Sequence, residues 1–361
     1  MSGKEQEERA RLLAWYDQSR RILPWREDPT PYHVWLSEIM LQQTRVEAVR
    51  GYYERFLAAL PDIPSLAAAG EEALSKLWEG IGYYSRVRNL KKAAQVIVND
   101  YGGKMPGTRE ELRKLPGIGP YTSAAIASIA FGEPVPAVDG NLQRIFARRT
   151  TYEEPIKTKQ AGEAAERFFA ARISKDRPGD TNQALMDLGA MICLPNGAPH
   201  CEACPWEPFC LARHQGRETA LPIMPAKIQK RREEKTVFLI SCGDQILLHK
   251  REETGLLAGL WEFPNEAGHL STEEAREVLA REGLLPLSIT PLPPARHVFT
   301  HLVWEMTGYR VELESLPDPV RHPASPDWQF AGRGELAGRY AIPSAFSAFR
   351  ERILKEPSLP R

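Results

Sequence analysis

The chain has 361 residues, equal numbers of basic and acidic side chains (47 each) and 42% hydrophobic residues. This length suits two or three domains, and the balanced charge argues against a protein that coats DNA by electrostatics alone, although a local basic patch remains open. No apolar run approaches the roughly 20 residues of a membrane span, and the charged N-terminus is not a secretory signal. We therefore expect a cytoplasmic protein.

Residues 1 to about 215 are predicted to be helical, because apolar residues recur there at three- and four-residue spacing. Several of the segments end at Gly or Pro, as helices commonly do. The clearest are 7–20, 32–44, 71–80, 88–102 and 161–173. No alternating pattern of a strand interrupts this half.

The second predicted helix carries Glu38 among apolar neighbours, including Trp35 and Met40. A carboxyl group that is half buried among such residues has a raised pKa and suits general acid catalysis. A solvated helix acid is the default alternative on this evidence alone.

A glycine turn, LPGIG at 115–119, separates two helical segments. Gly117 and Gly119 permit positive φ and leave backbone N–H groups unshielded, and Pro120 suits the first position of a helix. A helix N-terminus with bare amides binds phosphate. An ordinary helix–helix turn is the alternative.

A proline-containing loop then leads to Asp139, which is followed by NLQRIFARR. Asp139 alone would be an ordinary helix cap. Together, however, the turn, the small residues from Thr122 to Ala125 and the loop resemble the helix-hairpin-helix and Gly/Pro–Asp signature of a DNA glycosylase superfamily. The resemblance implies that the hairpin grips a DNA phosphate and that Asp139 faces the sugar whose base is removed.

Superfamily members that also cut the DNA backbone carry a Lys where this chain has Tyr121. A phenol cannot form the imine on which that reaction depends. We therefore expect base removal without Schiff-base strand cleavage.

Four of the five cysteines fall in one short stretch and read as a metal or cluster site. They are Cys193, Cys201, Cys204 and Cys210. Their thiolates would suit either zinc or a cubane cluster. One CxxC with flanking single cysteines resembles the 4Fe–4S loop of the glycosylase superfamily, although that loop usually has six residues between the first two cysteines and this one has seven.

The segments LPWR (23–26), WLSEIMLQQT (35–44) and GIGYYSRVRNL (80–90) resemble the adenine-removing, MutY-type branch. The resemblance implies that Glu38 protonates the departing adenine and that Asp139 stabilises or attacks the sugar cation, oriented by Tyr121 and Asn141. It also implies DNA contacts, with Gln43 wedging into the base stack and Arg26 and Tyr83 near the opposite base. Further candidates for DNA contact are Gln42, Thr44, Arg86, Gly117 and Gly119. A solvated helix face is an equal alternative for Arg86, and Tyr84 reads as a core residue.

The character of the chain changes after Cys210. Residues 216–235 contain prolines and a charge cluster and are predicted to be a linker. Two apolar runs around Gly243-Asp244 predict a hairpin, residues 301–313 predict a strand, and residues 271–284 predict a short helix. The second half is therefore predicted to be a separate α+β domain.

This second domain resembles a Nudix-type domain, whose working members bind Mg²⁺ through paired Glu on a helix. Here the two ligand positions are Ala280 and Arg281, so we expect no Mg²⁺-dependent Nudix chemistry. In adenine glycosylases such a domain recognises 8-oxoguanine through a Phe-Ser-His signature. Phe299, Thr300 and His301 stand at those positions, with threonine keeping the hydroxyl.

The prediction is a multidomain protein: an all-α helix-hairpin-helix DNA glycosylase region at 1–215 with a 4Fe–4S cluster loop, a linker at 216–235 and an α+β Nudix-like domain at 236–361. The first region divides into a six-helix module at about 30–136 and an iron–sulfur module from 1–29 and 137–215. We expect a monomer that binds one 4Fe–4S cluster and acts on double-stranded DNA containing adenine opposite 8-oxoguanine or guanine. The alternatives are a thymine or oxidised-pyrimidine glycosylase, a non-catalytic DNA-binding or redox-sensing protein, and a Nudix hydrolase.

Overall fold

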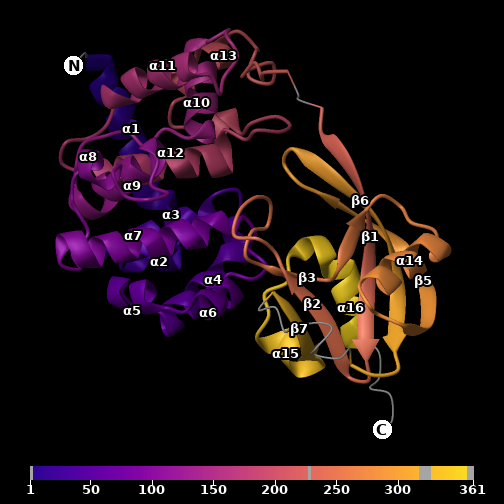
Figure 1. Ribbon diagram of the computed structural model, residues 1–361. Coiled ribbons are helices and arrows are strands. Elements are labelled where there is room, and N and C mark those ends of the chain that lie inside the picture. Colours follow the sequence, from indigo (N-terminus) through magenta and orange to yellow (C-terminus); the bar gives the residue numbers. More distant parts are fainter. Residues whose placement is uncertain (1–2, 227–228, 317–326, 356–361) are drawn as a thin grey trace. The chain divides into compact units, whose positions relative to one another are not determined.

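The computed structural model describes residues 3–226, 229–316 and 327–355 (Figure 1). The chain groups into two compact units, one made of Met1–Ala68 and Arg88–Ala226 and the other of Ala69–Val87 and Lys227–Arg361. The first is helical and the second carries a sheet, which agrees with the predicted fold class. Among the described residues, no helix has the length and apolar character needed to cross a membrane.

The first unit, which includes most of α7, contains helices and no strand among its described residues. Its α-helices are α1 (Gly3–Ser19), α2 (Pro24–Glu27), α3 (Pro31–Leu41), α4 (Val46–Ala59), α5 (Ile63–Ala68), α7 (Ser85–Tyr101), α8 (Arg109–Leu112), α9 (Pro120–Phe131), α10 (Gly140–Thr150), α11 (Lys159–Ala170), α12 (Pro178–Asp187) and α13 (Leu211–His214). A π-helix, η1 (Leu188–Ile192), and two 3-10 turns, η2 (Cys201–Ala203) and η3 (Glu207–Phe209), follow α12.

Four of the five predicted helical segments form helices of this unit, and the fifth, at 71–80, forms α6 (Glu71–Leu77) in the second unit. The helix that carries Glu38 ends at Leu41, three residues earlier than predicted. Gln43 lies in the left-handed region (φ 57°) just beyond this end, which is why the helix does not continue to Thr44.

A hydrophobic core joins the N-terminal helix to the chain beyond Asp139. Tyr16 of α1 packs with Phe146 of α10, Phe169 of α11 and Trp206 of the cysteine loop. Trp206 stacks on Phe169 with ring centroids 6.3 Å apart, and its indole N–H donates to the Glu8 carbonyl at 2.7 Å. This shared core holds the cysteine loop against α1 and α11.

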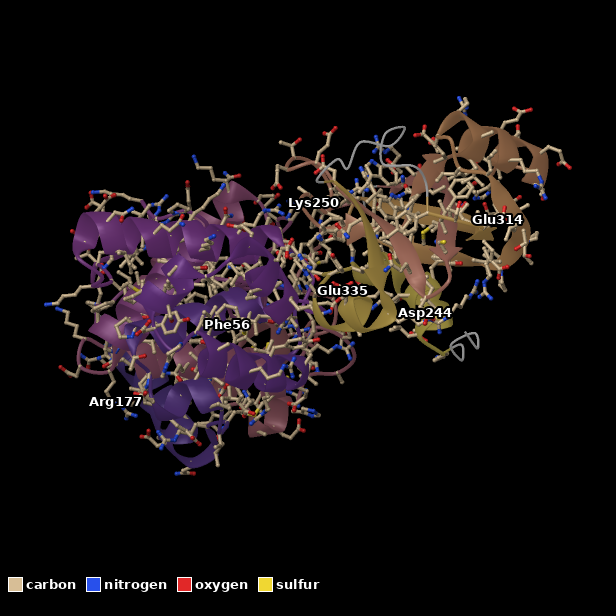
Figure 2. All side chains as sticks on the ribbon, turned by 60° about the horizontal axis from the view of Figure 1, so that its bottom comes forward. Phe56, Arg177, Asp244, Lys250, Glu314 and Glu335 are labelled. Atoms are coloured by element: carbon tan, nitrogen blue, oxygen red, sulfur yellow. The ribbon has the colours of Figure 1, made fainter. Side chains whose placement is uncertain are left out.

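Figure 2 shows the polar and apolar side chains of both units. Phe56, a fully buried residue of α4, lies among the helices, whereas Arg177 and Glu314 lie at the outside of their respective units.

Close packing inside the helical unit depends on small residues: Thr122, Ser123, Ala124 and Ala125 of α9 are all buried. Such residues let α9 approach α3 and α12 closely.

The second unit has a seven-stranded sheet of order β3-β2-β1-β6-β5, with β4 on β1 and β7 on β2. Its elements besides α6 are β1 (Arg231–Cys242), β2 (Gln245–Lys250), β3 (Trp261–Glu262), β4 (Asn265–Ala267), α14 (Thr272–Arg281), β5 (Pro286–Val298), β6 (Leu302–Leu313), β7 (Trp328–Gly332), α15 (Arg333–Gly338), η4 (Ser344–Phe346) and α16 (Ser347–Lys355).

The predicted hairpin is confirmed: β1 and β2 pair antiparallel up to Cys242–Gln245, and Gly243 adopts positive φ in the turn. β1 begins at Arg231, however, so residues 231–235 of the predicted linker lie in a strand. They pair in parallel with β6, starting at Arg231–Leu302. The predicted strand at 301–313 and the predicted helix at 271–284 appear as β6 and α14.

β5 was not predicted from the sequence, because it contains four prolines, which are untypical of a strand. β5 stands at the end of the strand order, and within the part of the chain that the structure describes it pairs with β6 alone. Proline is tolerated at an edge because the missing N–H is not needed by a second neighbour. The register shifts between Leu292 and Ala295, around Pro293 and Pro294.

The segment Ala69–Val87 belongs to the second unit, although it lies within the region predicted as the glycosylase domain. Glu79 explains this grouping. Its carboxylate accepts hydrogen bonds from the Ile342 backbone N–H (3.2 Å) and the Arg350 guanidinium (2.8 Å), and it pairs with Lys76 at 2.6 Å. These charge-assisted bonds tie the turn after α6 to α16 and the segment before it.

Candidate active site

Glu38 lies on α3, where residues Val34 to Met40 are all buried. A helix that is apolar on all sides packs into the interior, so only 7% of Glu38 is exposed. Burial, together with the charge of Asp139, raises the pKa of Glu38 to about 7, while a hydrogen bond from Tyr121 and the charge of Arg26 oppose this rise. Glu38 is therefore protonated in about half of the molecules at pH 7.

Asp139 is the N-cap of α10 and is half-buried. Its Oδ1 accepts hydrogen bonds from the backbone N–H groups of Asn141 (2.9 Å) and Leu142 (2.8 Å), and its Oδ2 accepts one from the Asn141 side-chain amide (2.8 Å). Burial raises the pKa of Asp139 above its ordinary value, and these donors and the nearby Arg144 limit the rise. The donors favour the carboxylate form of Asp139.

Tyr121 lies in the first turn of α9 and interacts with both acids. Its hydroxyl hydrogen-bonds Glu38, and burial with the charges of Glu38 and Asp139 raises the pKa of Tyr121 well above its ordinary value. The phenol thus stays neutral as a hydrogen-bond donor. Glu38, Tyr121 and Asp139, which are far apart in the sequence, form one interacting group.

Asn141 continues this group toward the cysteine loop. Its side-chain oxygen accepts a hydrogen bond from Arg144 (3.0 Å), and Arg144 also donates to the carbonyls of Cys193 and Gly189, both at 2.8 Å. A Cβ at Gly189 would lie 2.9 Å from the Cβ of Asn141, so only glycine fits there. Asn141 is therefore held from two sides while it holds Asp139.

Asn182 is a structural residue of the site that the sequence analysis missed. It is fully buried on α12. It accepts from the Ala137 N–H (2.9 Å) and donates to the Val135 carbonyl (2.9 Å) and the Ser128 hydroxyl (2.8 Å). These bonds set the path of the loop that ends at Asp139. The polar amide of Asn182 in an otherwise buried helix was the sequence signal that could have indicated this structural role.

Arg26, predicted to lie near the base opposite the substrate, forms a bidentate pair with Asp187 at 2.8 and 2.9 Å. Arg21 binds the same carboxylate at 2.6 Å. Asp187 is fully buried and was not singled out from the sequence. Within this network, the charge of Arg26 lowers the pKa of both Glu38 and Tyr121.

The glycine turn differs in one respect from the prediction. Gly117 adopts positive φ (76°), and a Cβ there would lie 2.6 Å from the Cβ of Asn89. Gly119 instead has φ −87° and is the N-cap of α9, where no side chain caps the helix and a Cβ would meet nothing within 4 Å. Gly119 thus leaves open space at the helix N-terminus.

The segment after α3 presents Gln43 to solvent in its left-handed conformation. The adjacent Gln42 anchors this segment by donating to the Thr122 hydroxyl of α9 at 3.3 Å. The Thr44 hydroxyl donates to the Gln42 carbonyl at 3.3 Å. Gln43 is thereby fixed close to the helix that carries Tyr121.

In the second unit, Tyr83 lies in a turn with φ 49° and is 46% exposed, whereas Tyr84 is buried as expected for a core residue. Arg86 is also buried. It donates to the carbonyls of Ile81 (3.2 Å) and Gly82 (3.1 Å), and its guanidinium lies over the rings of Trp78 and Tyr83. Arg86 thus shapes the turn that presents Tyr83, and its burial excludes the alternative that Arg86 lies on a solvated helix face. A phosphate contact by Arg86 stays a prediction.

The Tyr83 hydroxyl hydrogen-bonds the Thr300 hydroxyl at 2.6 Å, within the second unit. Thr300 and His301 are exposed at the turn between β5 and β6. Phe299 packs against Trp304 with ring centroids 4.9 Å apart, and its N–H donates to the Leu302 carbonyl (2.9 Å). The predicted triplet is therefore anchored by Phe299 and open at Thr300 and His301.

The chain matches known protein families and known proteins. Residues 36–171 match the model of the HhH-GPD superfamily of base excision DNA repair proteins, and residues 236–352 match that of the NUDIX domain. The chain is 35% identical to the adenine DNA glycosylase of Homo sapiens, covering 89% of this chain and 69% of that protein. It is 34% identical to the enzyme of the same name from Mus musculus, covering 88% and 73%.

The chain belongs to the adenine DNA glycosylase family.

Among solved structures, a thermostable thymine-DNA glycosylase superposes with a TM-score of 0.53 and 29% sequence identity, covering 59% of this chain and all of that one. Family membership and this likeness agree with the predicted fold class. Glu38 and Asp139 both lie within the range that matches the superfamily model.

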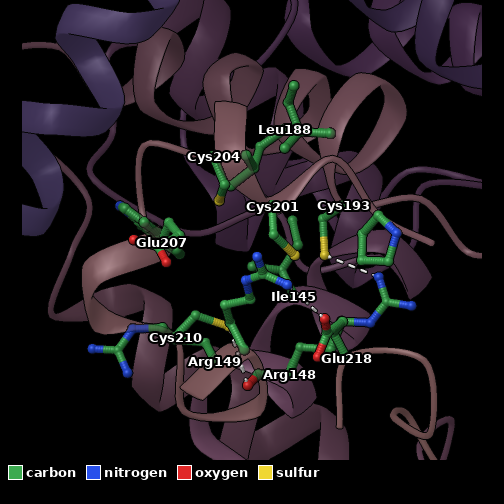
Figure 3. A pocket seen from close by; sticks show the side chains of 14 residues that line it. Ile145, Arg148, Arg149, Leu188, Cys193, Cys201, Cys204, Glu207, Cys210 and Glu218 are labelled. Atoms are coloured by element: carbon green, nitrogen blue, oxygen red, sulfur yellow. Dashed lines mark hydrogen bonds and ion pairs between the residues drawn. The ribbon is translucent and has the colours of Figure 1, made fainter. Parts of the chain in front are cut away.

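The four clustered cysteines of this family member line one pocket together with Arg148, Arg149 and Trp206. All four cysteines are free, half-buried thiols. Figure 3 shows their sulfur atoms turned toward the same space. Burial raises the pKa of Cys204 to about 12 and also raises that of Cys201 and Cys210. Four such sulfurs are a donor set suited to iron or zinc, whose binding would favour the thiolates.

Proposed function

We propose that this chain hydrolyses the N-glycosidic bond of adenine mispaired with 8-oxoguanine or guanine in duplex DNA, leaving an abasic site. The observation that carries this proposal is the pair of acids, both of which interact electrostatically with Tyr121. Glu38 has a pKa of about 7, and Asp139 has three N–H donors on its carboxylate. Two carboxyl groups with opposite protonation states are what cleavage at a sugar carbon requires.

In the proposed reaction the adenosine is first flipped out of the duplex, at a cost of a few kcal/mol that is smaller at a mismatch. Glu38 then protonates a ring nitrogen of adenine so that the base leaves neutral. Ionised Asp139 stabilises the sugar cation or forms a transient bond with it, and water completes the hydrolysis, with Glu38 as the base. Asn141 and Tyr121 hold the two acids in place.

The reaction is proposed to stop at the abasic site. Tyr121 stands where a Schiff-base lysine would be needed, and its hydroxyl is bound to Glu38. Without an amine at this position, the sugar cannot form the imine that leads to strand cleavage.

Recognition of the opposite base is proposed for the turn carrying Phe299, Thr300 and His301, together with Tyr83. The paired hydroxyls of Tyr83 and Thr300 are accessible and suit an oxidised purine, which has both a donor and an acceptor to satisfy. Gln43 would fill the gap left by the flipped base, and the amides after Gly119 would bind a phosphate. The DNA partner would be contacted by a monomer.

For the cysteine pocket we propose one 4Fe–4S cluster held by Cys193, Cys201, Cys204 and Cys210. When bound, such a cluster supplies a structural anchor and a one-electron redox couple. The spacing of the cysteines, one CxxC with flanking single cysteines, supports a cluster over zinc.

The Nudix-like domain is proposed to lack pyrophosphatase activity. Ala280 and Arg281, which occupy the ligand positions, are exposed on α14. A methyl group and a guanidinium offer no oxygen ligand for Mg²⁺.

The test is single-turnover cleavage of three duplexes that carry A opposite 8-oxoguanine, A opposite G, and T opposite G. We expect adenine release from the first two, fastest from the first, and no strand cleavage without alkali. Failure to release adenine from the first duplex at any salt concentration would refute the proposal. Release of thymine instead would favour the second candidate, a thymine glycosylase, which the 29% identity to a solved thymine-DNA glycosylase supports.

A further inference from the structure

Two consecutive arginines of α10, Arg148 and Arg149, reach the cysteine pocket with different partners. Arg149 is paired with the carboxylate of Glu8, which is fully buried and also binds Arg172. Arg149 therefore has an anionic partner, a carboxylate of α1 that it shares with Arg172.

Arg148 is equally buried, with 3% exposure. Its Nε donates to the Leu221 carbonyl at 2.9 Å, and its Nη1 donates to the Leu194 carbonyl at 2.8 Å and to Cys193 Sγ at 3.3 Å. Two of these partners are uncharged carbonyls, and the third, Cys193, is uncharged when it is a thiol. None of them therefore balances the positive charge of the guanidinium. The nearby Glu218, whose pKa Arg148 helps to lower, is hydrogen-bonded to Arg213.

Arg148 also touches a second cysteine, because its own carbonyl accepts a hydrogen bond from Cys210 Sγ at 3.6 Å. Figure 3 shows the bond from the Arg148 guanidinium to Cys193. Arg148 thus contacts the first and last cysteines of the loop and binds the chain at Leu194 within the loop and at Leu221 beyond it.

A buried cation and an N–H···S bond both favour additional negative charge on a thiolate-bound cluster, and hydrogen bonds to the sulfurs are a known determinant of cluster potential. We propose that Arg148 raises the reduction potential of the cluster held by the four cysteines. This rests on the cluster binding given under Proposed function. In the redox step one electron enters the cluster from an electrode, no bond breaks, and no proton moves because arginine stays protonated.

Arg213 provides a matched control. It lines the same pocket and is hydrogen-bonded to Glu218 at 3.0 Å. Its side chain is 42% exposed, so water and Glu218 screen its charge. Replacing it removes one positive charge from the pocket without removing an N–H···S bond.

The experiment compares full-length parent protein with Arg148→Lys, Arg148→Gln and Arg213→Gln. Iron content and visible absorbance are measured first, followed by voltammetry of each protein bound to a DNA duplex on an electrode. We expect a lower potential in Arg148→Gln, a smaller decrease in Arg148→Lys, which keeps the charge but lacks the forked donors, and no shift in Arg213→Gln. A lower potential follows because the reduced, more negative state loses its stabilisation.

Equal potentials in the parent and an iron-loaded Arg148→Lys or Arg148→Gln protein would overturn the inference, as would an equal shift in Arg213→Gln. Loss of iron from both Arg148 variants would also overturn it, since Arg148 would then be needed to bind the cluster and not to tune it. A parent protein without iron would instead refute the proposed cofactor itself.

Discussion

The acid pair of the helical unit and the Phe299–His301 turn of the second unit are built in opposite ways. Glu38 is 7% exposed, and Asp139 has three N–H donors. Thr300 is exposed, and its hydroxyl is paired with that of another exposed residue, Tyr83. Proton transfer at neutral pH depends on a desolvated carboxyl group held in advance, whereas recognition of a damaged base requires groups that DNA can reach.

The largest expected effect is loss of the charge on Asp139. The Asp139→Asn variant should lose roughly 10²–10³-fold in the single-turnover rate, because an amide cannot stabilise the developing cation. Glu38→Gln should be similarly slow, and both should still bind the duplex. Asp100→Asn, at an exposed position of α7, is the matched control. If Asp139→Asn and Asp100→Asn cleave equally fast, the acid pair is not the catalytic site.

The pH dependence of the cleavage rate tests whether Glu38 is the proton donor. Glu38 must be protonated to act as an acid, and its pKa is about 7. The single-turnover rate should therefore fall about tenfold per pH unit above that value. A rate that stays constant from pH 6 to pH 9 would exclude Glu38 as the proton donor.

Linkage predicts a matching effect on stability. Since burial raises the pKa of Glu38 above its ordinary 4.5, the stability present below pH 4.5 is lost as the pH rises through 7, up to on the order of 3 kcal/mol. Urea unfolding at pH 5 and pH 8 should show a smaller loss for Glu38→Gln than for the parent. Identical losses in the two proteins would contradict the raised pKa.

Asn182 tests whether the loop before Asp139 must be held from α12. In Asn182→Ala, a buried donor and two buried acceptors lose their partner, at a cost of roughly 2–4 kcal/mol in the free energy of unfolding. The cleavage rate should fall as well, because the position of Asp139 relaxes. Asn99→Ala, at an exposed site of α7, is the control for both measurements. An Asn182→Ala protein as stable and active as this control would exclude the positioning role.

The smallest expected effect lies in the exposed turn. Thr300→Val keeps the shape of the side chain but removes its hydroxyl, and one hydrogen bond of this kind contributes about 1 kcal/mol. The preference for A opposite 8-oxoguanine over A opposite G should fall by roughly threefold to tenfold, while cleavage of the A·G duplex changes little. Thr300→Ser should retain the preference. If valine and serine behave alike, the hydroxyl does not read the lesion.

Features set by short spacings could be predicted from the sequence. The glycine turn, the small residues after it, the loop to Asp139 and the cluster of four cysteines are each contained within about 30 residues. So are the β1–β2 hairpin and the helix with Ala280 and Arg281. Local chain geometry and residue type decide these features, and neither needs information about distant neighbours.

Other features came only from the tertiary structure. A proline-rich segment forms β5 because, among the described strands, it needs to pair with β6 alone. Ala69–Val87 groups with the second unit through Glu79. Asn182 and Asp187 read as ordinary helix residues until the fold buried them against the loop and against Arg26.

The amino-acid sequence by itself thus determined which chemical groups are present and which short motifs carry them: two acids, a tyrosine in place of a lysine, and four clustered thiols. Only the tertiary structure decided that burial raises the pKa of Glu38 to about 7 and that Arg148 contacts Cys193. The physical reason is that burial and electrostatic interaction depend on distances between residues that are remote along the chain, and these distances exist only after packing.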